Sequence, residues 1–274
     1  MLTRVLEGFV TRIHHWRAPN PNVRPPIIRP NVYYANRLLT LRRKLPSYLH
    51  YPVVVTTRRD NVRLYLSRDP IDEKVAQNVS VAYRTSYFPP VPLPLLARPT
   101  ILDLGAHHGF YTVHALAVYP QANIICVEPN RVAIRLLKWN LMLNDWLPRA
   151  RLVHAGLAAT TTTGSLRLST AGSWGDSLFE PSETTRAVQR IPLLTLADIL
   201  QEARPEIVKC NAEGAEFEFV RQLLGMSWRP ALLSIAVHEE WGDAQALVAT
   251  LQREGYQMMK TGEPHRPVLH FWKD

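Results

Sequence analysis

The chain has 274 residues, a hydrophobic fraction of 46% and a formal net charge of +9, which suits one large domain, or one domain with a substantial extension. We expect neither a membrane-spanning segment nor a signal peptide, because no apolar run has the required length or flanks. Cys126 and Cys210 each lie in an apolar run, so buried free thiols in a cytoplasmic protein are expected rather than a disulfide or a zinc site.

The first hundred residues predict an extension built from small elements. Apolar residues at helical spacing predict an amphipathic helix over residues 2–16, which packs on its own domain or, in a homodimer, on a second subunit. A proline-rich connector follows at 19–30. The segments 51–57 and 62–67 predict two short strands. A helix is expected to begin at Asp69, a capping residue that precedes a proline.

The positive charge lies largely before residue 100, in clusters of basic residues. They include Arg42, Arg43, Lys44, Arg58, Arg59 and Arg63. A basic surface of this kind can bind nucleic acid, an anionic substrate or an acidic membrane face. No aromatic residues accompany the charge in a nucleic-acid-binding pattern, so we interpret it mainly as ordinary surface charge.

The proline-rich stretch 88–99 marks the boundary that we expect between an extension, residues 1–98, and a second unit, residues 99–274. Beyond it, apolar runs alternate with helical patterns, which is typical of βαβ units and a mostly parallel sheet. The expected strands are 100–104, 123–128, 151–154, 206–211 and 232–238, and the expected helices are 110–118, 131–143, 196–203, 214–224 and 244–254. Two more strands, 164–169 and 187–192, belong to an insertion around a polar loop.

The turn that follows the strand 100–104 predicts a ligand site. Gly105 allows a tight turn that leaves room for a ligand beside the backbone, in the crevice where open α/β sheets bind nucleotides. The dinucleotide fingerprint is absent, because His107 stands where its second glycine belongs, and Asp103 suits a cationic methionine group better than a pyrophosphate. Glu128, at the end of the next strand, can accept hydrogen bonds from both hydroxyls of a ribose. Together these residues favour S-adenosylmethionine.

The sequence resembles the FkbM-type methyltransferase family over about Val53 to Tyr256. The matching blocks are Asp103–Thr112, Val127–Asn130, Leu137–Asn144, His154–Ala158, Gly172–Leu178, Ile191–Leu200, Val208–Glu216 and the strand that reaches His238. The resemblance implies a Rossmann-like class I methyltransferase fold, which is α/β with a mostly parallel seven-stranded sheet and helices on both faces. It also implies S-adenosylmethionine as the cofactor, used most often to O-methylate a hydroxyl group of a sugar or another metabolite.

The motifs and the resemblance together assign a set of candidate cofactor-binding residues. They are Asp103, Gly105, Ala106, His107, Gly109, Tyr111, Thr112, Glu128, Pro129, Gly156, Leu157, Ser177 and Asn211. Three positions depart from the family pattern: His107 replaces Asn, Asn211 replaces Asp and Ala236 replaces Glu. The change at Asn211 keeps a polar side chain but removes a charge. It impairs the chemistry if the family's Asp is a base or a metal ligand, and it is harmless if that Asp only positions a ligand.

Four residues are the candidates for catalysis: His238, Glu213, Lys209 and Asn211. His238 ends an expected strand, and the ordinary histidine pKa near neutrality suits a general base for a hydroxyl, although a strand-end histidine is as often structural. Lys209 is expected to face the substrate or to pair with Glu213, and such an ion pair can simply orient the loop before Gly214. The spacing of these residues does not demand a metal, and none is predicted.

Other polar residues near these motifs receive less specific expectations. Glu216 and Glu218 are interpreted as surface or capping charges of a helix. One of His107 and His108 is expected to reach the methionine carboxylate, while the other is exposed. The polar loop at 173–177 is expected to wall the active site.

The residues therefore predict an S-adenosylmethionine-dependent methyltransferase that O-methylates a hydroxylated small molecule, such as a sugar, a glycolipid or a secondary metabolite. One alternative is an RNA or DNA methyltransferase, motivated by the net charge of +9 and by Arg42, Arg43, Arg58 and Arg59. A second alternative is a non-catalytic protein that binds S-adenosylmethionine, motivated by the departures from the family pattern.

Overall fold

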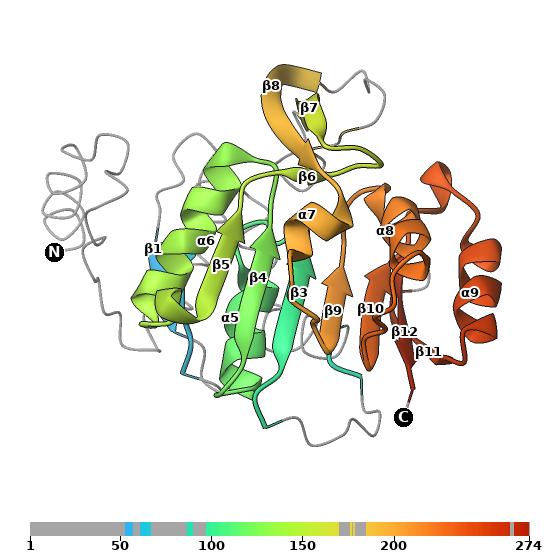
Figure 1. The fold of residues 1–274 in the computed structure, drawn as a ribbon. Helices are drawn as coiled ribbons and strands as arrows, with labels where there is room; N and C mark the ends of the chain where they lie inside the picture. Colours follow the sequence, from blue (N-terminus) through green and yellow to red (C-terminus); the bar gives the residue numbers. More distant parts are fainter. Residues whose placement is uncertain are drawn as a thin grey trace, which may run out of the picture.

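The computed structural model of the chain describes residues 53–56, 61–66, 87–89, 97–169, 176, 178, 185–263 and 266–273 (Figure 1). Several expectations lie outside these residues: the helix at 2–16, the connector at 19–30, the helix from Asp69, and the basic residues Arg42, Arg43, Lys44, Arg58 and Arg59. Within the described part of the chain, no helix combines the length and the apolar character needed to cross a membrane.

A seven-stranded sheet with the order β11-β12-β10-β9-β3-β4-β5 forms the centre of the molecule. Its strands are β3 (Thr100–Leu104), β4 (Asn123–Val127), β5 (Ala150–Val153), β9 (Ile207–Cys210), β10 (Leu232–Ala236), β11 (Gln257–Glu263) and β12 (Arg266–Trp272). The five strands β3, β4, β5, β9 and β10 are parallel, whereas β12 is antiparallel to both β10 and β11. The predicted mostly parallel seven-stranded α/β sheet is confirmed.

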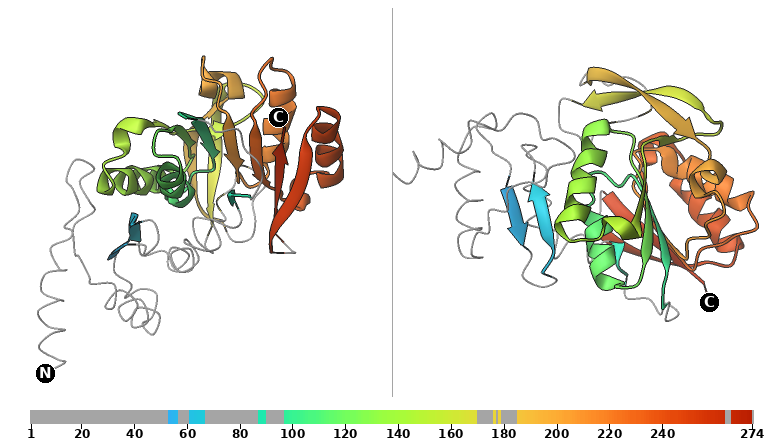
Figure 2. Two further views of the ribbon diagram at one scale, coloured as in Figure 1. Left: turned by 90° about the horizontal axis from the view of Figure 1, so that it is seen from below. Right: turned by 60° about the vertical axis from the view of Figure 1, so that its left-hand side comes forward.

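Helices cover both faces of this sheet, as predicted (Figure 2). One face carries α5 (Phe110–Val118) and α6 (Arg131–Leu143), and the other carries α7 (Leu196–Leu200), α8 (Ala215–Leu224) and α9 (Ala244–Arg253). Successive side chains of β3 alternate between the two layers, so Ile101 packs in the first and Leu102 in the second. Because β3 is covered on both faces, Asp103 is fully buried, with 0% of its surface exposed.

A second, smaller sheet with the order β6-β8-β7 projects beyond the carboxyl ends of the parallel strands (Figure 1). It consists of β6 (Gly156–Leu157), β7 (Thr162–Ser169) and β8 (Thr185–Leu194), with β7 and β8 antiparallel. The two strands predicted for the insertion are confirmed and are longer than expected, while β6 was not predicted.

The two predicted N-terminal strands form a hairpin, β1 (Val53–Thr56) and β2 (Arg63–Leu66), which docks on α6. Asn140 and Asn144, one helical turn apart, accept hydrogen bonds from the backbone N–H groups of Tyr65 and Arg63 at 2.6 and 2.9 Å. Asn144 also donates to the carbonyl of Arg63 at 2.7 Å. Asn140 donates in turn to the carbonyl of His108, also at 2.7 Å. The hairpin is thereby tied to the turn that follows β3.

Two strands of the seven-stranded sheet were not predicted, and the ends of other elements differ from the prediction by a few residues. The missed strands are the antiparallel pair β11 and β12. β11 is an edge strand with exposed residues such as Gln257, Met258 and Lys260, and it lacks a clear alternating pattern. Helix α7 ends at Leu200, three residues early, since Gln201 adopts a positive φ of 56°. Short 3₁₀ turns follow α6 at Leu147–Arg149 and β10 at Glu239–Trp241.

Candidate functional site

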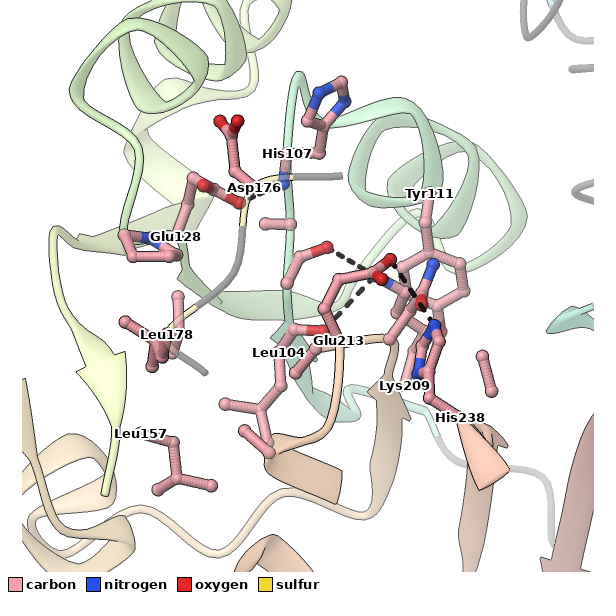
Figure 3. A pocket seen from close by; sticks show the side chains of 18 of the residues that line it. Leu104, His107, Tyr111, Glu128, Leu157, Asp176, Leu178, Lys209, Glu213 and His238 are labelled. Carbon is pink, nitrogen blue, oxygen red and sulfur yellow. Dashed lines mark hydrogen bonds and ion pairs between the residues drawn. The ribbon is translucent and has the colours of Figure 1, made fainter. Parts of the chain in front are cut away.

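A pocket opens where the parallel strands β3, β4, β9 and β10 end (Figure 3). The turn after β3 contributes Gly105–His107, the end of β4 contributes Glu128, the loop after β9 contributes Asn211–Glu213, and the end of β10 contributes His238. The remaining walls include Tyr87, Leu157, Asp176, Leu178, Pro267 and Val268. This position is the usual ligand crevice of an open α/β sheet.

The turn after β3 approaches the loop after β9 so closely that Gly105 has no room for a side chain. Gly105 has a φ of 73°, and a Cβ at this position would lie 1.8 Å from the backbone oxygen of Asn211. The N–H groups of Gly105 and Ala106 both donate to the carbonyl of Val127 at 3.0 Å, which joins the turn to β4. Two later positions, His107 at φ 49° and Gly109 at φ 81°, also adopt the left-handed conformation before α5 begins.

The carboxylate of Glu128 is buried at one end of the pocket. One oxygen accepts a hydrogen bond from the N–H of His107 at 2.7 Å, and the other accepts from the N–H of Asn130 at 2.8 Å. Burial raises the pKa of Glu128 to about 7, and these two hydrogen bonds oppose the shift. Each carboxylate oxygen can accept a further hydrogen bond, so the group is suited to hold a pair of ligand hydroxyls.

Two residues of the polar loop between β7 and β8 lie beside Glu128. Asp176 accepts hydrogen bonds from the side chain of Asn130 at 2.5 Å and from the N–H of Ser169 at 2.8 Å. Leu178 packs against Gly156, where a Cβ would lie 2.7 Å from its Cδ1 atom. Asp176 is the one described residue of the predicted 173–177 loop and it lines the pocket, as does Leu178 just beyond that loop.

Lys209 pairs with Asp103 rather than with Glu213. Its Nζ atom lies 2.9 Å from Asp103 Oδ1 and donates to the carbonyl of Gly105 at 2.7 Å. The second Asp103 oxygen accepts from the hydroxyl of Thr112 at 2.6 Å. Because β3 and β9 are neighbours with Asp103 and Lys209 in register, the two charges satisfy each other inside the sheet. Asp103 therefore does not line the pocket, contrary to the expectation that it faces a bound cationic group.

His238 lies between two carboxylates at the other end of the pocket. Its Nδ1 atom is 2.9 Å from Glu216 Oε1, and its Nε2 atom is 3.4 Å from Glu213 Oε1. Burial of the ring favours the neutral form, but the two carboxylates outweigh this effect and raise the pKa of His238 to about 10. These contacts favour a protonated imidazole near neutral pH and argue against His238 as the general base, and its catalytic role stays a prediction.

Glu213 has an unusual backbone conformation beside the pocket. Its φ is 48° and that of the following Gly214 is 103°, so the loop after β9 turns sharply into α8. Glu213, Asn211 and Ala236, one of the departures from the family pattern, line the same pocket. The replacement of the family's Asp by Asn211 therefore removes a negative charge from the lining of the pocket.

Eleven of the candidate residues line this pocket, and four other described candidates do not. The lining candidates are Gly105, Ala106, His107, Tyr111, Glu128, Pro129, Leu157, Lys209, Asn211, Glu213 and His238. Asp103, Gly109, Thr112 and Gly156 do not line it, and Ser177 lies outside the described residues.

The expected exposure of two pairs of residues, His107 with His108 and Glu216 with Glu218, differs from what the structure shows. His108 is buried and stacks on His107, with ring centroids 3.8 Å apart, so neither ring is the fully exposed one that the sequence suggested. Glu216 is buried rather than a surface charge, but it does accept the N–H of the N-cap residue Gly214, as the capping alternative expects. The carboxylate of Glu218 forms an ion pair with Arg221. The pocket residues Tyr87, Pro267 and Val268 were missed, because they come from segments far from every motif.

Comparisons with known proteins agree on one family and one fold. Residues 103–258, more than half of the chain, match the family described as the methyltransferase FkbM domain. The methyltransferase sdnD of Sordaria araneosa is 27% identical over 202 residues, covering 61% of this chain and 76% of that protein.

A solved structure is similar to the fold described above. It is the crystal structure of methyltransferase FkbM from Methylobacillus flagellatus, which matches with a TM-score of 0.50 and 18% identity over 70% of this chain and 48% of that chain. This chain thus spans about half the length of that protein. The likeness concerns the fold alone, and the predicted class I methyltransferase fold is confirmed.

Proposed function

The chain belongs to the FkbM methyltransferase family, and from this premise we propose that it transfers the methyl group of S-adenosylmethionine to a hydroxyl group of a small molecule. One observation carries the proposal: the pocket at the carboxyl ends of the strands joins two chemically different ends (Figure 3). One end combines Glu128 with the apolar residues Leu157 and Leu178, and the other combines Glu213 with His238.

The residues at the Glu128 end fit an adenosine group. Because Gly105 carries no side chain, the turn after β3 packs directly on the backbone of Asn211, and the two segments form adjacent walls of the pocket. The carboxylate of Glu128 can accept hydrogen bonds from the two ribose hydroxyls, and Leu157 and Leu178 offer apolar contact to a flat base. When bound, the cofactor supplies a methyl group that is already activated by a positively charged sulfur.

At the other end, the protein must hold the acceptor oxygen in line with the methyl group and remove its proton. We assign the role of general base, which removes this proton, to Glu213. A bound cofactor would supply the methyl group to the acceptor oxygen and would leave as the neutral thioether, while the Glu213 carboxylate would take up the hydroxyl proton. The left-handed φ of 48° at Glu213 supports a functional role, since strained non-glycine conformations concentrate at active sites.

Other groups at this end are poorly suited to take the proton. His238 has a pKa of about 10 and already carries a proton near neutral pH. Burial, followed by the nearby charge of Asp103, raises the pKa of the Tyr111 phenol well above its ordinary value, so its ionised form is disfavoured. Lys209 is engaged with Asp103 and Gly105.

The charges at this end favour an uncharged acceptor. The cation of Lys209 is neutralised by Asp103, and the cation of His238 lies between two carboxylates. An acceptor that carried a carboxylate or phosphate next to its reacting hydroxyl would meet the negative charge of Glu213. A neutral hydroxyl of a sugar, a glycolipid or a secondary metabolite avoids this repulsion.

Calorimetric titration with S-adenosylmethionine and with its demethylated product tests the cofactor assignment. The wild-type chain should bind both, and Glu128→Ala should bind at least about 100-fold more weakly, because two charge-assisted hydrogen bonds are lost. Glu218→Ala, which changes a carboxylate outside the pocket, serves as the control and should bind like wild type. A folded wild-type chain that binds neither compound would overturn the proposal. Mass spectrometry of acceptor mixtures incubated with enzyme and cofactor then tests transfer to neutral hydroxyls.

A further inference from the structure

Glu216 is a fully buried carboxylate in contact with His238, a residue that lines the acceptor end of the pocket. It lies in the first turn of α8, with 0% of its surface exposed, and it does not itself line the pocket. One oxygen accepts the N–H of Gly214 at 2.8 Å. The other faces two donors of His238, the backbone N–H at 2.7 Å and the ring Nδ1 atom at 2.9 Å. A carboxylate with this much burial is stable only when donors and an opposite charge surround it.

The contact to Glu216 determines how the ring of His238 is oriented. With Nδ1 bound to Glu216, the Nε2 atom points toward Glu213 and the pocket (Figure 3). A carboxylate oxygen only accepts hydrogen bonds, so a ring nitrogen that faces one is stabilised by carrying a hydrogen. Both ring nitrogens face carboxylates, which is the arrangement of a protonated imidazole.

The two carboxylates are not equivalent partners of this cation. Glu216 approaches Nδ1 to 2.9 Å and is fully buried, whereas Glu213 is 3.4 Å from Nε2 and its side chain is 28% exposed. By distance and burial, Glu216 is the closer and more enclosed of the two counter-charges. Glu239 and Glu240, which follow His238, are exposed. Two carboxylates around one cation leave a net negative charge in the cluster, and Glu213 is the carboxylate of the pair that lines the pocket, where an acceptor hydroxyl would approach.

We propose that Glu216 is a positioning residue that holds His238 as an imidazolium and thereby leaves Glu213 free to accept the proton of the acceptor hydroxyl. The catalytic half of this inference rests on the function proposed above. Two carboxylates that share a single cation carry a net negative charge, so uptake of the hydroxyl proton by Glu213 relieves repulsion within the cluster. Burial lowers the pKa of His238, whereas both carboxylates raise it, Glu213 ahead of Glu216, to a net value of about 10. The assignment to Glu216 therefore rests on its shorter distance and its full burial.

The test measures the titration of His238 by NMR of the full chain labelled with ¹⁵N in its histidine rings. In wild type, the His238 ring should stay protonated well above neutral pH. In Glu216→Gln, its pKa should fall to about the ordinary value of 6.5. Glu218→Gln makes the same change two residues along the same helix, on a carboxylate paired with Arg221, and should leave the titration unchanged. An unchanged titration in Glu216→Gln would overturn the proposal.

A second variant keeps the inference testable if Glu216→Gln does not fold. Glu213 is partly exposed, so Glu213→Gln should fold. It should leave His238 protonated near neutral pH, because Glu216 still binds Nδ1. A His238 pKa that falls to its ordinary value in Glu213→Gln would show that Glu213 holds the cation, and the assignment to Glu216 would be wrong.

The catalytic half of the proposal, that Glu213 accepts the hydroxyl proton, is tested by measuring kcat as a function of pH. Glu213→Gln should lower kcat by at least about 100-fold, the usual contribution of a general base. Glu216→Gln should lower kcat with little change in the KM for the cofactor, and should shift the profile. A Glu216→Gln enzyme with the wild-type profile would overturn the catalytic half. Absence of turnover in wild type, with the NMR result as expected, would instead count against the proposed function and leave the Glu216–His238 relationship standing.

Discussion

The backbone N–H of His107 donates a 2.7 Å hydrogen bond to the carboxylate of Glu128. The turn after β3 and the end of β4 therefore hold each other in place, and a single side chain serves both the fold and the proposed ribose site. Burial raises the pKa of this carboxyl group to about 7, so its charge changes within the physiological range.

Affinity for S-adenosylmethionine should consequently rise with pH through about 7 and then level off. The pKa of Glu128 is raised from 4.5 to about 7 in the folded protein, so the protonated carboxyl group is favoured by folding. Its contribution to the free energy of unfolding is fully present below pH 4.5 and is lost as the pH rises through about 7. Above that point the ionised carboxylate is the better acceptor for ribose hydroxyls. Calorimetric titrations on both sides of neutrality measure the slope, and Glu128→Gln should abolish it. An equal slope in that variant would assign the pH dependence to another group.

Gly105→Ala should lower the free energy of unfolding by about 2–4 kcal/mol, from left-handed strain and overpacking together, and should prevent cofactor binding. The added Cβ would lie 1.8 Å from a backbone oxygen, which cannot easily move. Gly255→Ala is a matched control, since Gly255 has a φ of 88° but no atom within 4 Å of its Cβ position. It should cost only about 1–2 kcal/mol and should bind normally. Urea unfolding and calorimetry of both variants check the prediction, and similar behaviour of the two would refute the close approach.

Asn140→Asp should weaken cofactor binding, although residue 140 lies outside the pocket. The substitution keeps an acceptor for the N–H of Tyr65 but removes the donor to the carbonyl of His108. We expect a loss of about 1–3 kcal/mol in stability together with a measurable rise in the cofactor Kd. Asn144→Asp likewise keeps an acceptor for Arg63 and loses its donors. It should destabilise the hairpin without affecting the Kd. Equal effects of both variants on the Kd would contradict a specific link to the turn.

Lys209→Met should destabilise the protein by about 3–5 kcal/mol, because Asp103 would then be a buried charge without its cation. Adding Asp103→Leu should recover much of the loss. The exposed pair of Arg221 and Glu218 gives a comparison, since Arg221→Met should change stability by no more than about 1 kcal/mol. Urea unfolding of the single and double variants yields the coupling energy. A coupling near zero would mean that the buried pair is not the main partner of either charge.

Asn211→Asp distinguishes an active enzyme from a decayed one. If Asn211 only positions a ligand, wild type should turn over and the variant should change kcat by less than about tenfold, an energy of about 1.4 kcal/mol. Activity that appears only in the variant would favour a non-catalytic wild-type protein. Acceptor methylation, followed by mass spectrometry, gives the answer.

The local patterns predicted the central fold well. The strands before Gly105 and Glu128 are apolar runs that end in a glycine turn or a polar residue, and such endings place ligand residues at one edge of a parallel sheet. The order of strands in the sheet is a long-range property. Lys209 was expected to pair with the nearby Glu213, but its partner Asp103 lies 106 positions away on the adjacent strand.

The role of Glu216 could not be predicted for a related reason. An acidic residue in the first turn of a helix is usually a capping charge, and a sequence does not reveal which side of that turn faces the sheet. His238 was singled out correctly as a residue of the pocket. Its protonation, however, depends on two glutamates brought together by the packing of α8 beside β10, and the ordinary pKa of histidine was a poor guide.

The strand order has a consequence for how the molecule is made on the ribosome. Among the described strands β12 comes last in sequence, yet it lies inside the sheet between β10 and β11. Until residues 266–272 leave the exit tunnel, β10 presents an unpaired edge, and the pocket lacks Pro267 and Val268. In a nascent chain, strands β3, β4, β5, β9 and β10 can therefore pair before β12 does, while β11 stays separate from them. Ligand binding should begin only after β12 has been inserted between β10 and β11.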